Sequence, residues 1–192
     1  GTYLAPALVL AGQAHGDVGA GRPPGFPAFL AAVFMCGGGA KAAVVALCVI
    51  GALACAPIYL SGRLAGGFRT GMAAMIFFGF NITALAHSPM LLSDTIFAFL
   101  AAWQLYFFLR FLKGVASRPL FLALAASCAG LAALVRPSGL FWLAPMLVLI
   151  LLAPRLRLGK RLRLSAMAAA VFLILTFPWM ARNHFIGEGF FL

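Results

Sequence analysis

The feature that most constrains this chain is a succession of long apolar runs separated by short polar or basic loops. A helix needs about 20 apolar residues to cross a bilayer, and several of the runs approach that length. The residues are 65% hydrophobic and only 9% charged, which excludes a soluble globular domain. We predict an all-α, polytopic membrane bundle of about six spans within residues 42–181. The expected spans are residues 42–60, 68–86, 91–112, 120–135, 140–153 and 164–180.

The segment ahead of the first expected span has a different pattern. An apolar run opens at Arg22-Pro23-Pro24-Gly25-Phe26-Pro27 and ends at Gly37, after about half the length of a span. Because proline is tolerated in a first helical turn, we predict a short helix over 24–36 that lies on the membrane surface. A second short interfacial segment is expected over 2–14. Residues 1–41 would then form a juxtamembrane region with two membrane-parallel helices on the extracytoplasmic side.

The charge distribution predicts the orientation of the bundle. The formal net charge of +11 does not indicate nucleic-acid binding, because the basic residues form short clusters between apolar runs instead of one amphipathic face. Alternate loops hold ten of the fourteen: Arg63, Arg69, Arg110, Lys113, Arg118, Arg155, Arg157, Lys160, Arg161 and Arg163. The positive-inside rule places these loops in the cytoplasm. The opposite side receives all the acids and histidines: Asp17, Asp94, Glu188, His15, His87 and His184. Any chemistry is therefore expected on the extracytoplasmic side, where residues 182–192 would begin a further loop.

No cofactor is predicted. The acids and histidines lack the spacing of metal ligands, and the four cysteines include no Cys-x-x-Cys pair. The cysteines are predicted to be small apolar packing residues. A divalent metal ion that shares the binding of the phosphate stays an alternative.

Three polar positions near the ends of expected spans each allow two interpretations. Ser93 and Asp94 either cap a helix N-terminus or belong to a polar site. Arg136 either extends to lipid headgroups or binds a phosphate with its several donors. Trp179 and Arg182 either anchor the chain at the membrane interface or join that site.

Five motifs occur in a characteristic order along the chain. They are Tyr3 with the small and apolar residues after it, Arg22-Pro23-Pro24-Gly25-Phe26-Pro27, Ser93-Asp94, Leu134-Val135-Arg136-Pro137-Ser138-Gly139 and Pro178-Trp179-Met180-Ala181-Arg182-Asn183. Their order resembles that in the bacterial polyprenyl-phosphate-dependent glycosyltransferases of the C type. This group includes protein O-mannosyltransferases and the lipid A aminoarabinose transferase. The first extracytoplasmic loop of that family forms two membrane-parallel helices, in agreement with the two short segments expected here.

The resemblance implies a reaction and a set of site residues. A sugar would move, with inversion, from a polyprenyl-phosphate donor to a lipid or protein acceptor at the outer face of the bacterial inner membrane. The family's catalytic aspartate would lie before Gly1, so the chain is expected to be a fragment that lacks its first span, its catalytic base and its later part. The candidates for binding the phosphate are Arg22, Arg136 and Arg182, and those around the sugar or acceptor are His87, Asp94 and Asn183.

A charge inside the membrane is costly, so isolated lipid-facing charges are disfavoured. We therefore predict that Arg22, Asp94, Arg136 and Arg182 converge on one outer-face cavity. Two alternatives remain, which are a lipid or small-molecule transporter and a non-catalytic scaffold. Transporters usually place polar residues near the membrane midplane, and the expected spans are nearly free of charge there.

Overall fold

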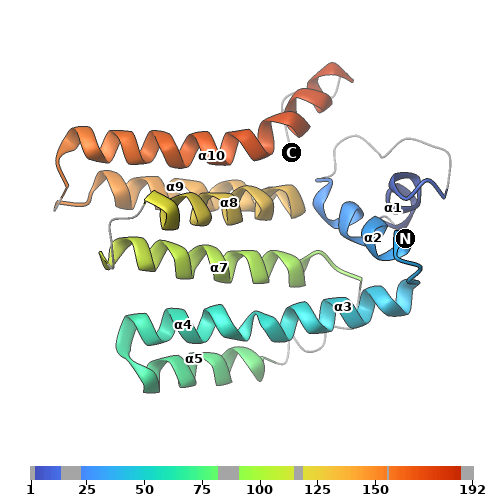
Figure 1. Cartoon of the computed structure of the whole chain (residues 1–192), viewed down its shortest axis with the longest axis horizontal. Coiled ribbons are helices and arrows are strands. Elements are labelled where there is room, and N and C mark those ends of the chain that lie inside the picture. Colours follow the sequence, from blue (N-terminus) through green and yellow to red (C-terminus); the bar gives the residue numbers. More distant parts are fainter. Residues whose placement is uncertain (1–2, 14–22, 82–90, 115–118, 155, 187–192) are drawn as a thin grey trace.

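The computed structural model describes residues 3–13, 23–81, 91–114, 119–154 and 156–186. These residues fold into helices joined by turns, with no strand among them (Figure 1). The helices are α1 (Leu4–Leu10), α2 (Gly25–Met35), α3 (Ala40–Leu53), α4 (Cys55–Gly66), α5 (Phe68–Gly79), α7 (Asp94–Leu112), α8 (Pro119–Val135), the 3-10 turn η1 (Pro137–Gly139), α9 (Leu140–Leu151) and α10 (Leu158–Phe185). The predicted all-α fold is confirmed.

The longer helices lie along the longest axis of the molecule and alternate in direction (Figure 1). The C-termini of α4, α7 and α9 and the N-termini of α5, α8 and α10 lie at one end, on the left of Figure 1. We call this the basic end. The opposite end, which we call the polar end, holds the N-terminus of α7 and the C-termini of α8 and α10.

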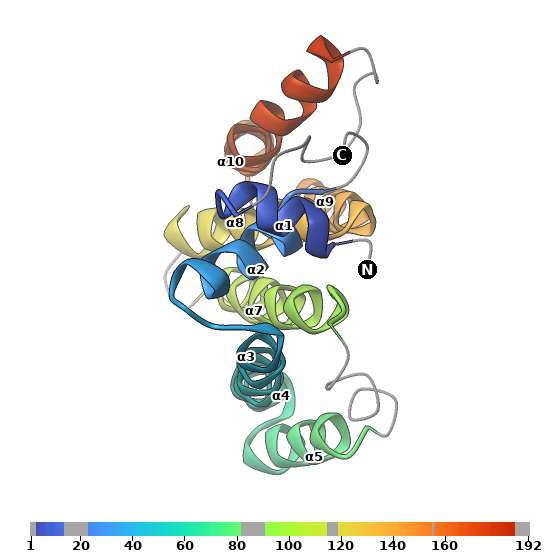
Figure 2. The same cartoon turned by 90° about the vertical axis from the view of Figure 1, so that its right-hand side faces the viewer.

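Helices α1 and α2 run across the polar end of the bundle, and their direction is plain when the bundle is viewed along its axis (Figure 2). Phe26 and Leu30 of α2 are buried against Ala7 of α1 and Leu47 of α3. The ring of Tyr3 meets that of Phe26 edge to face, with 5.0 Å between the ring centroids. The two short helices predicted ahead of the first span are thus present, and apolar packing fixes them to the bundle.

Three of the described helical segments are long and apolar enough to cross a membrane. They are Ala40–Gly66, in which α3 and α4 follow each other almost without a break, Asp94–Leu112 and Leu158–Phe185. Shorter apolar helices cover Gly25–Met35, Pro119–Val135 and Pro137–Leu151. Large apolar side chains such as Phe77 and Ile174 are exposed on the outside of the bundle, as expected where lipid surrounds a protein.

Several predicted helix ends differ from those of the structure. The segment predicted as 42–60 continues to Gly66, with a break at Ala54. Pro57 has no N–H to bond the Leu53 carbonyl, which explains the break. Helix α5 ends at Gly79, and the rest of the span predicted over 68–86 lies largely outside the described residues.

The last helix is longer than the sequence predicted. α10 covers Leu158–Phe185 instead of 164–180 and continues through Pro178. Its red C-terminal part bends away from the bundle in Figure 1. Pro178 removes one hydrogen bond of the helix and causes such a bend, and neighbouring groups commonly compensate for a proline inside membrane helices.

Helix α8 forms the centre of the bundle and contacts both α7 and α10. Its buried surface consists largely of small residues, which are Ala125, Ala126, Ala129, Gly130, Ala132 and Ala133. A Cβ added to Gly130 would lie only 3.1 Å from Cδ1 of Leu175 in α10. Small residues let membrane helices approach closely, and they position the C-terminus of α8 against its neighbours.

A second close approach fixes the turn after α8. A Cβ added to Gly139 would lie 2.4 Å from the backbone nitrogen of Ala133 and 2.5 Å from its Cα. Backbone atoms cannot turn aside as a flexible side chain can, so η1 must carry glycine here to pack on α8. The contact holds the segment between α8 and α9 in place.

We expect Gly139→Ala to lower the free energy of unfolding by about 1 to 3 kcal/mol, because the added methyl group forces η1 away from α8. Gly159→Ala in the first turn of α10 is the matched control, since a Cβ there meets nothing within 4 Å. Thermal unfolding midpoints in one detergent would compare the two proteins. Equal midpoints for Gly139→Ala and wild type would show that the contact contributes little.

Candidate substrate site at the polar end

Arg136 directly follows the end of α8, and Pro137 causes the helix to end there. α8 ends at Val135, and Arg136 has an extended backbone with φ −146° and ψ 135°. A residue before proline disfavours the helical conformation, so Pro137 accounts for the end of α8 at this position. With η1 packed on α8 through Gly139, the Arg136 side chain extends from a fixed segment of backbone.

Arg136 forms an ion pair with Asp94, the first residue of α7, through its Nη1 and the Asp94 Oδ1. The pair joins the start of α7 to the end of α8, and both helix ends lie at the polar end of the bundle (Figure 1). The exposed fractions of the two side chains are 40% for Arg136 and 51% for Asp94. A guanidinium has five N–H donors, so an accessible Arg136 can bind an anion while it stays paired with Asp94.

The alternative of a helix cap is only partly correct at the start of α7. The Ser93 side chain is buried but makes no capping hydrogen bond. Asp94 lies in the first turn, where a negative charge is favoured by the helix dipole. Its carboxylate also pairs with Arg136, so capping does not account for all of its contacts. Arg136 likewise has a partner within the protein, so extension toward lipid headgroups does not account for all of its contacts.

The start of helix α2 packs against the C-terminus of α8, close to the Asp94–Arg136 pair. A Cβ added to Gly25 would lie 2.8 Å from the Leu134 carbonyl oxygen and 2.9 Å from Cγ2 of Val135. Glycine therefore permits the approach, which brings the start of α2 close to the segment that carries Arg136. This contact was not predicted from the sequence, where its only signal is the glycine after Pro23-Pro24. Arg22 itself lies outside the described residues.

A second polar group lies on the last turns of α10. The Arg182 guanidinium carbon is 4.6 Å from the centroid of the Trp179 ring, in a cation–π contact. Arg182 Nη1 also donates a hydrogen bond of 3.4 Å to Oδ1 of Asn183, which is fully buried. Trp179 packs against the buried cluster of Ala129, Ala133 and Phe172, so its ring forms a fixed platform under the arginine.

The Trp179 indole carries a donor that the described residues leave unused. Its Nε1 atom is buried and has no hydrogen-bond partner among them. A buried N–H without a partner costs free energy, which a bound ligand with an acceptor oxygen would recover. The indole nitrogen is therefore a further candidate for contact with substrate.

The described part of the chain contains four of the six predicted site residues. It brings Asp94 and Arg136 into direct contact, and it places Arg182 and Asn183 side by side near the C-terminus of α10. Arg22 and His87 lie outside the described residues. A single cavity shared by Arg22, Asp94, Arg136 and Arg182 remains a prediction.

The described part of the chain holds no group of three or more histidine, cysteine, aspartate or glutamate side chains that could bind a metal ion. The four cysteines all lie within that part, and none of them forms a disulfide bond. The candidate site consists instead of arginines, one carboxylate, an asparagine and a tryptophan. This set suits the binding of a phosphate and of sugar hydroxyls.

Fold and site together define a helical membrane protein with fixed cationic side chains at one end of its bundle. Residues 21–181 match the family model of the dolichyl-phosphate-mannose-protein mannosyltransferases, and the chain therefore belongs to this family. The family consists of membrane glycosyltransferases, so the resemblance stated from the sequence is confirmed. Neither the curated proteins nor the solved structures gave a significant match.

Proposed function

We propose that the chain belongs to an enzyme that transfers a sugar from a polyprenyl-phosphate carrier to an acceptor at the extracytoplasmic face of the bacterial inner membrane. The family match supports the donor class. The observation that carries the assignment of a site is the Asp94–Arg136 ion pair, because it holds an accessible guanidinium at a membrane-helix boundary. A lipid phosphate would reach the protein at such a boundary.

The reaction requires stabilisation of the departing phosphate. An oxygen of the acceptor attacks the anomeric carbon, the bond from that carbon to the phosphate oxygen breaks, and the configuration inverts. Polyprenyl phosphate leaves with an additional negative charge, while a base takes the acceptor's proton. Prearranged cationic donors lower the free energy of a transition state in which such charge develops.

We assign the binding of this charge to the arginines. Arg136 would contact the phosphate, oriented by its pairing with Asp94, and Arg182 would contribute from its position on the Trp179 ring. Arg22 is proposed as a third cation because it precedes the helix that closes against α8. Asn183, His87 and the remaining carboxylate oxygen of Asp94 would bind hydroxyls of the sugar or of the acceptor.

The donor class can be tested with the intact purified protein in lipid nanodiscs. A radiolabelled sugar linked to polyprenyl phosphate would be supplied together with a membrane extract as the source of acceptors. We expect transfer of the label and release of polyprenyl phosphate, with no transfer when a nucleotide-linked sugar is the only donor. Transfer from the nucleotide sugar alone would contradict the proposal.

The proposed face can be tested separately by labelling cysteines in intact cells. With the four native cysteines replaced, an impermeant thiol reagent should label Ser138→Cys in η1 but not Lys113→Cys after α7. The reverse pattern would place the polar end in the cytoplasm and contradict the proposed location of the active face.

A further inference from the structure

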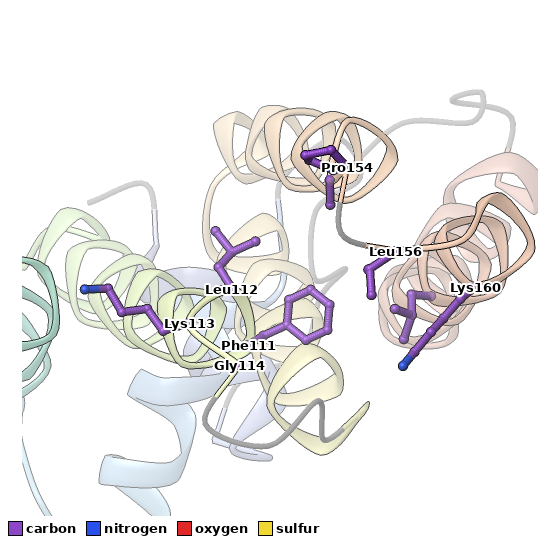
Figure 3. A pocket seen from close by; sticks show the side chains of 9 residues that line it. Phe111, Leu112, Lys113, Gly114, Pro154, Leu156 and Lys160 are labelled. Atoms are coloured by element: carbon purple, nitrogen blue, oxygen red, sulfur yellow. The ribbon is translucent and has the colours of Figure 1, made fainter.

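A cavity of about 230 Å³ lies at the basic end of the bundle, opposite the candidate site. It lies between the C-terminal turn of α7 and the connection that leads from α9 into α10 (Figure 3). Its walls are mostly apolar and include Phe111, Pro154, Leu156 and Leu164. Lys113 and Lys160 also line it, one from each side.

Contacts within the protein hold both walls of this cavity. Phe111 is almost completely buried and stacks on Phe108, with 6.2 Å between the ring centroids. On the other side, Arg161 Nε donates a hydrogen bond of 2.7 Å to the Leu156 carbonyl. Arg161 Nη1 donates a second one of 3.0 Å to the carbonyl of Leu151, at the end of α9. The arginine thereby fixes the position of Leu156 in the cavity wall.

The two lysines have no carboxylate to pair with in the described part of the chain. Asp94 is the one acidic residue there, and it pairs with Arg136 at the polar end. Figure 3 shows the Lys113 and Lys160 side chains leading away from the apolar centre, with their amines directed away from each other. Their long side chains are flexible enough to turn toward an anion at the mouth of the cavity.

The position of the cavity in the bundle indicates which kind of molecule can enter it. Lys113 directly follows α7 and Lys160 lies in the first turn of α10. Both helices are candidate membrane spans, so the cavity lies where the apolar part of a span ends. A molecule there meets hydrocarbon on one side and water on the other. Apolar walls with cations at the rim match a molecule that combines an alkyl chain with a phosphate headgroup.

We infer that this cavity binds an anionic phospholipid, with part of an acyl chain against Phe111, Leu156 and Leu164 and the phosphate at Lys113 and Lys160. A free phosphate ion would leave the apolar walls unused. The site is separate from the candidate substrate site and does not depend on the proposed transfer reaction.

The test measures lipid binding to the intact protein, purified in detergent, by native mass spectrometry. The probes are phosphatidylglycerol, phosphatidylcholine and inorganic phosphate. We expect preferential binding of phosphatidylglycerol to the wild type, with no competition from inorganic phosphate. The double variant Lys113→Gln/Lys160→Gln should bind it roughly thirtyfold more weakly, because each lysine near an anionic lipid contributes about a factor of five.

The matched control is Arg63→Gln/Arg69→Gln, which removes the same charge at the same end of the bundle but outside the cavity. It should keep the wild-type affinity. An equal loss in both double variants would show unspecific attraction by the basic end and overturn the inference. Binding of inorganic phosphate that displaces the lipid, or equal binding of phosphatidylcholine, would also overturn it.

Discussion

An Arg136→Gln enzyme is expected to transfer sugar about 100-fold more slowly than the wild type. Removal of one prearranged donor that stabilises developing negative charge typically costs a factor of about 10² to 10³ in rate. Arg136 is held by Asp94 and by the packed turn after α8, and glutamine at this position would present no charge to the phosphate. Arg136→Lys should retain an intermediate rate, because lysine keeps the charge but lacks the forked donors. Initial rates with a saturating lipid-linked donor would measure both effects.

The control for this prediction is Arg69→Gln, an exposed residue at the basic end in the first turn of α5. It removes one positive charge from the protein and should leave the transfer rate unchanged. Size-exclusion profiles and thermal midpoints would confirm that each variant is folded. A folded Arg136→Gln protein with the wild-type rate would leave interaction with lipid headgroups as the role of this side chain.

Trp179→Ala is expected to lower the transfer rate about tenfold. The substitution removes the ring beneath the Arg182 guanidinium, and a cation–π contact of this kind contributes about 0.5 to 2 kcal/mol. Trp179→Phe keeps an aromatic face and should stay within about threefold of the wild type. Equal rates for wild type and a folded Trp179→Ala protein would show that the platform does not position Arg182 for transfer.

The phenylalanine variant also separates the two possible roles of the tryptophan. Phenylalanine has no N–H, so it removes the Nε1 donor that has no partner among the described residues. A Trp179→Phe enzyme as slow as Trp179→Ala would assign the effect to this donor and not to the ring. The measurement would then favour a hydrogen bond from the indole to substrate.

The sequence predicted much of the architecture because its strongest signals are local. Apolar length predicted that α2 would be a short helix, since the apolar run there has about half the length of a span. The Arg136-Pro137 pair predicted the end of α8, because proline restricts the residue before it. Alternating basic loops predicted which connections share an end, and the described helix ends on either side of these loops lie together in Figure 1.

The remaining features depend on contacts between distant segments. The convergence of Asp94 and Arg136 was predicted from the cost of isolated charges in a membrane. Their direct pairing also requires α7 and α8 to lie side by side in one register, which composition does not determine. The close approach of Gly25 to Leu134 is likewise a tertiary contact that leaves only a glycine in the sequence. α10 continues through Pro178 although proline favours a helix end in isolation, and packing of Trp179 on the bundle supports that continuation.

The cavity at the basic end was also not predicted. Its two lysines were interpreted only as markers of orientation, because a run of basic residues does not reveal the apolar walls beside them. Those walls come from three segments, which are the end of α7, the α9–α10 connection and the start of α10. The sequence therefore indicated the charge at this end but not the space next to it.

The central claim is that the arginines at the polar end bind the phosphate of the lipid-linked donor. It is tested most directly by the affinity of the intact protein for polyprenyl phosphate, measured in nanodiscs for wild type, Arg136→Gln and the control Arg69→Gln. We predict a dissociation constant at least about tenfold higher for Arg136→Gln, in line with the loss of a charge-assisted hydrogen bond, and no change for Arg69→Gln. Equal affinities for wild type and Arg136→Gln would contradict the claim.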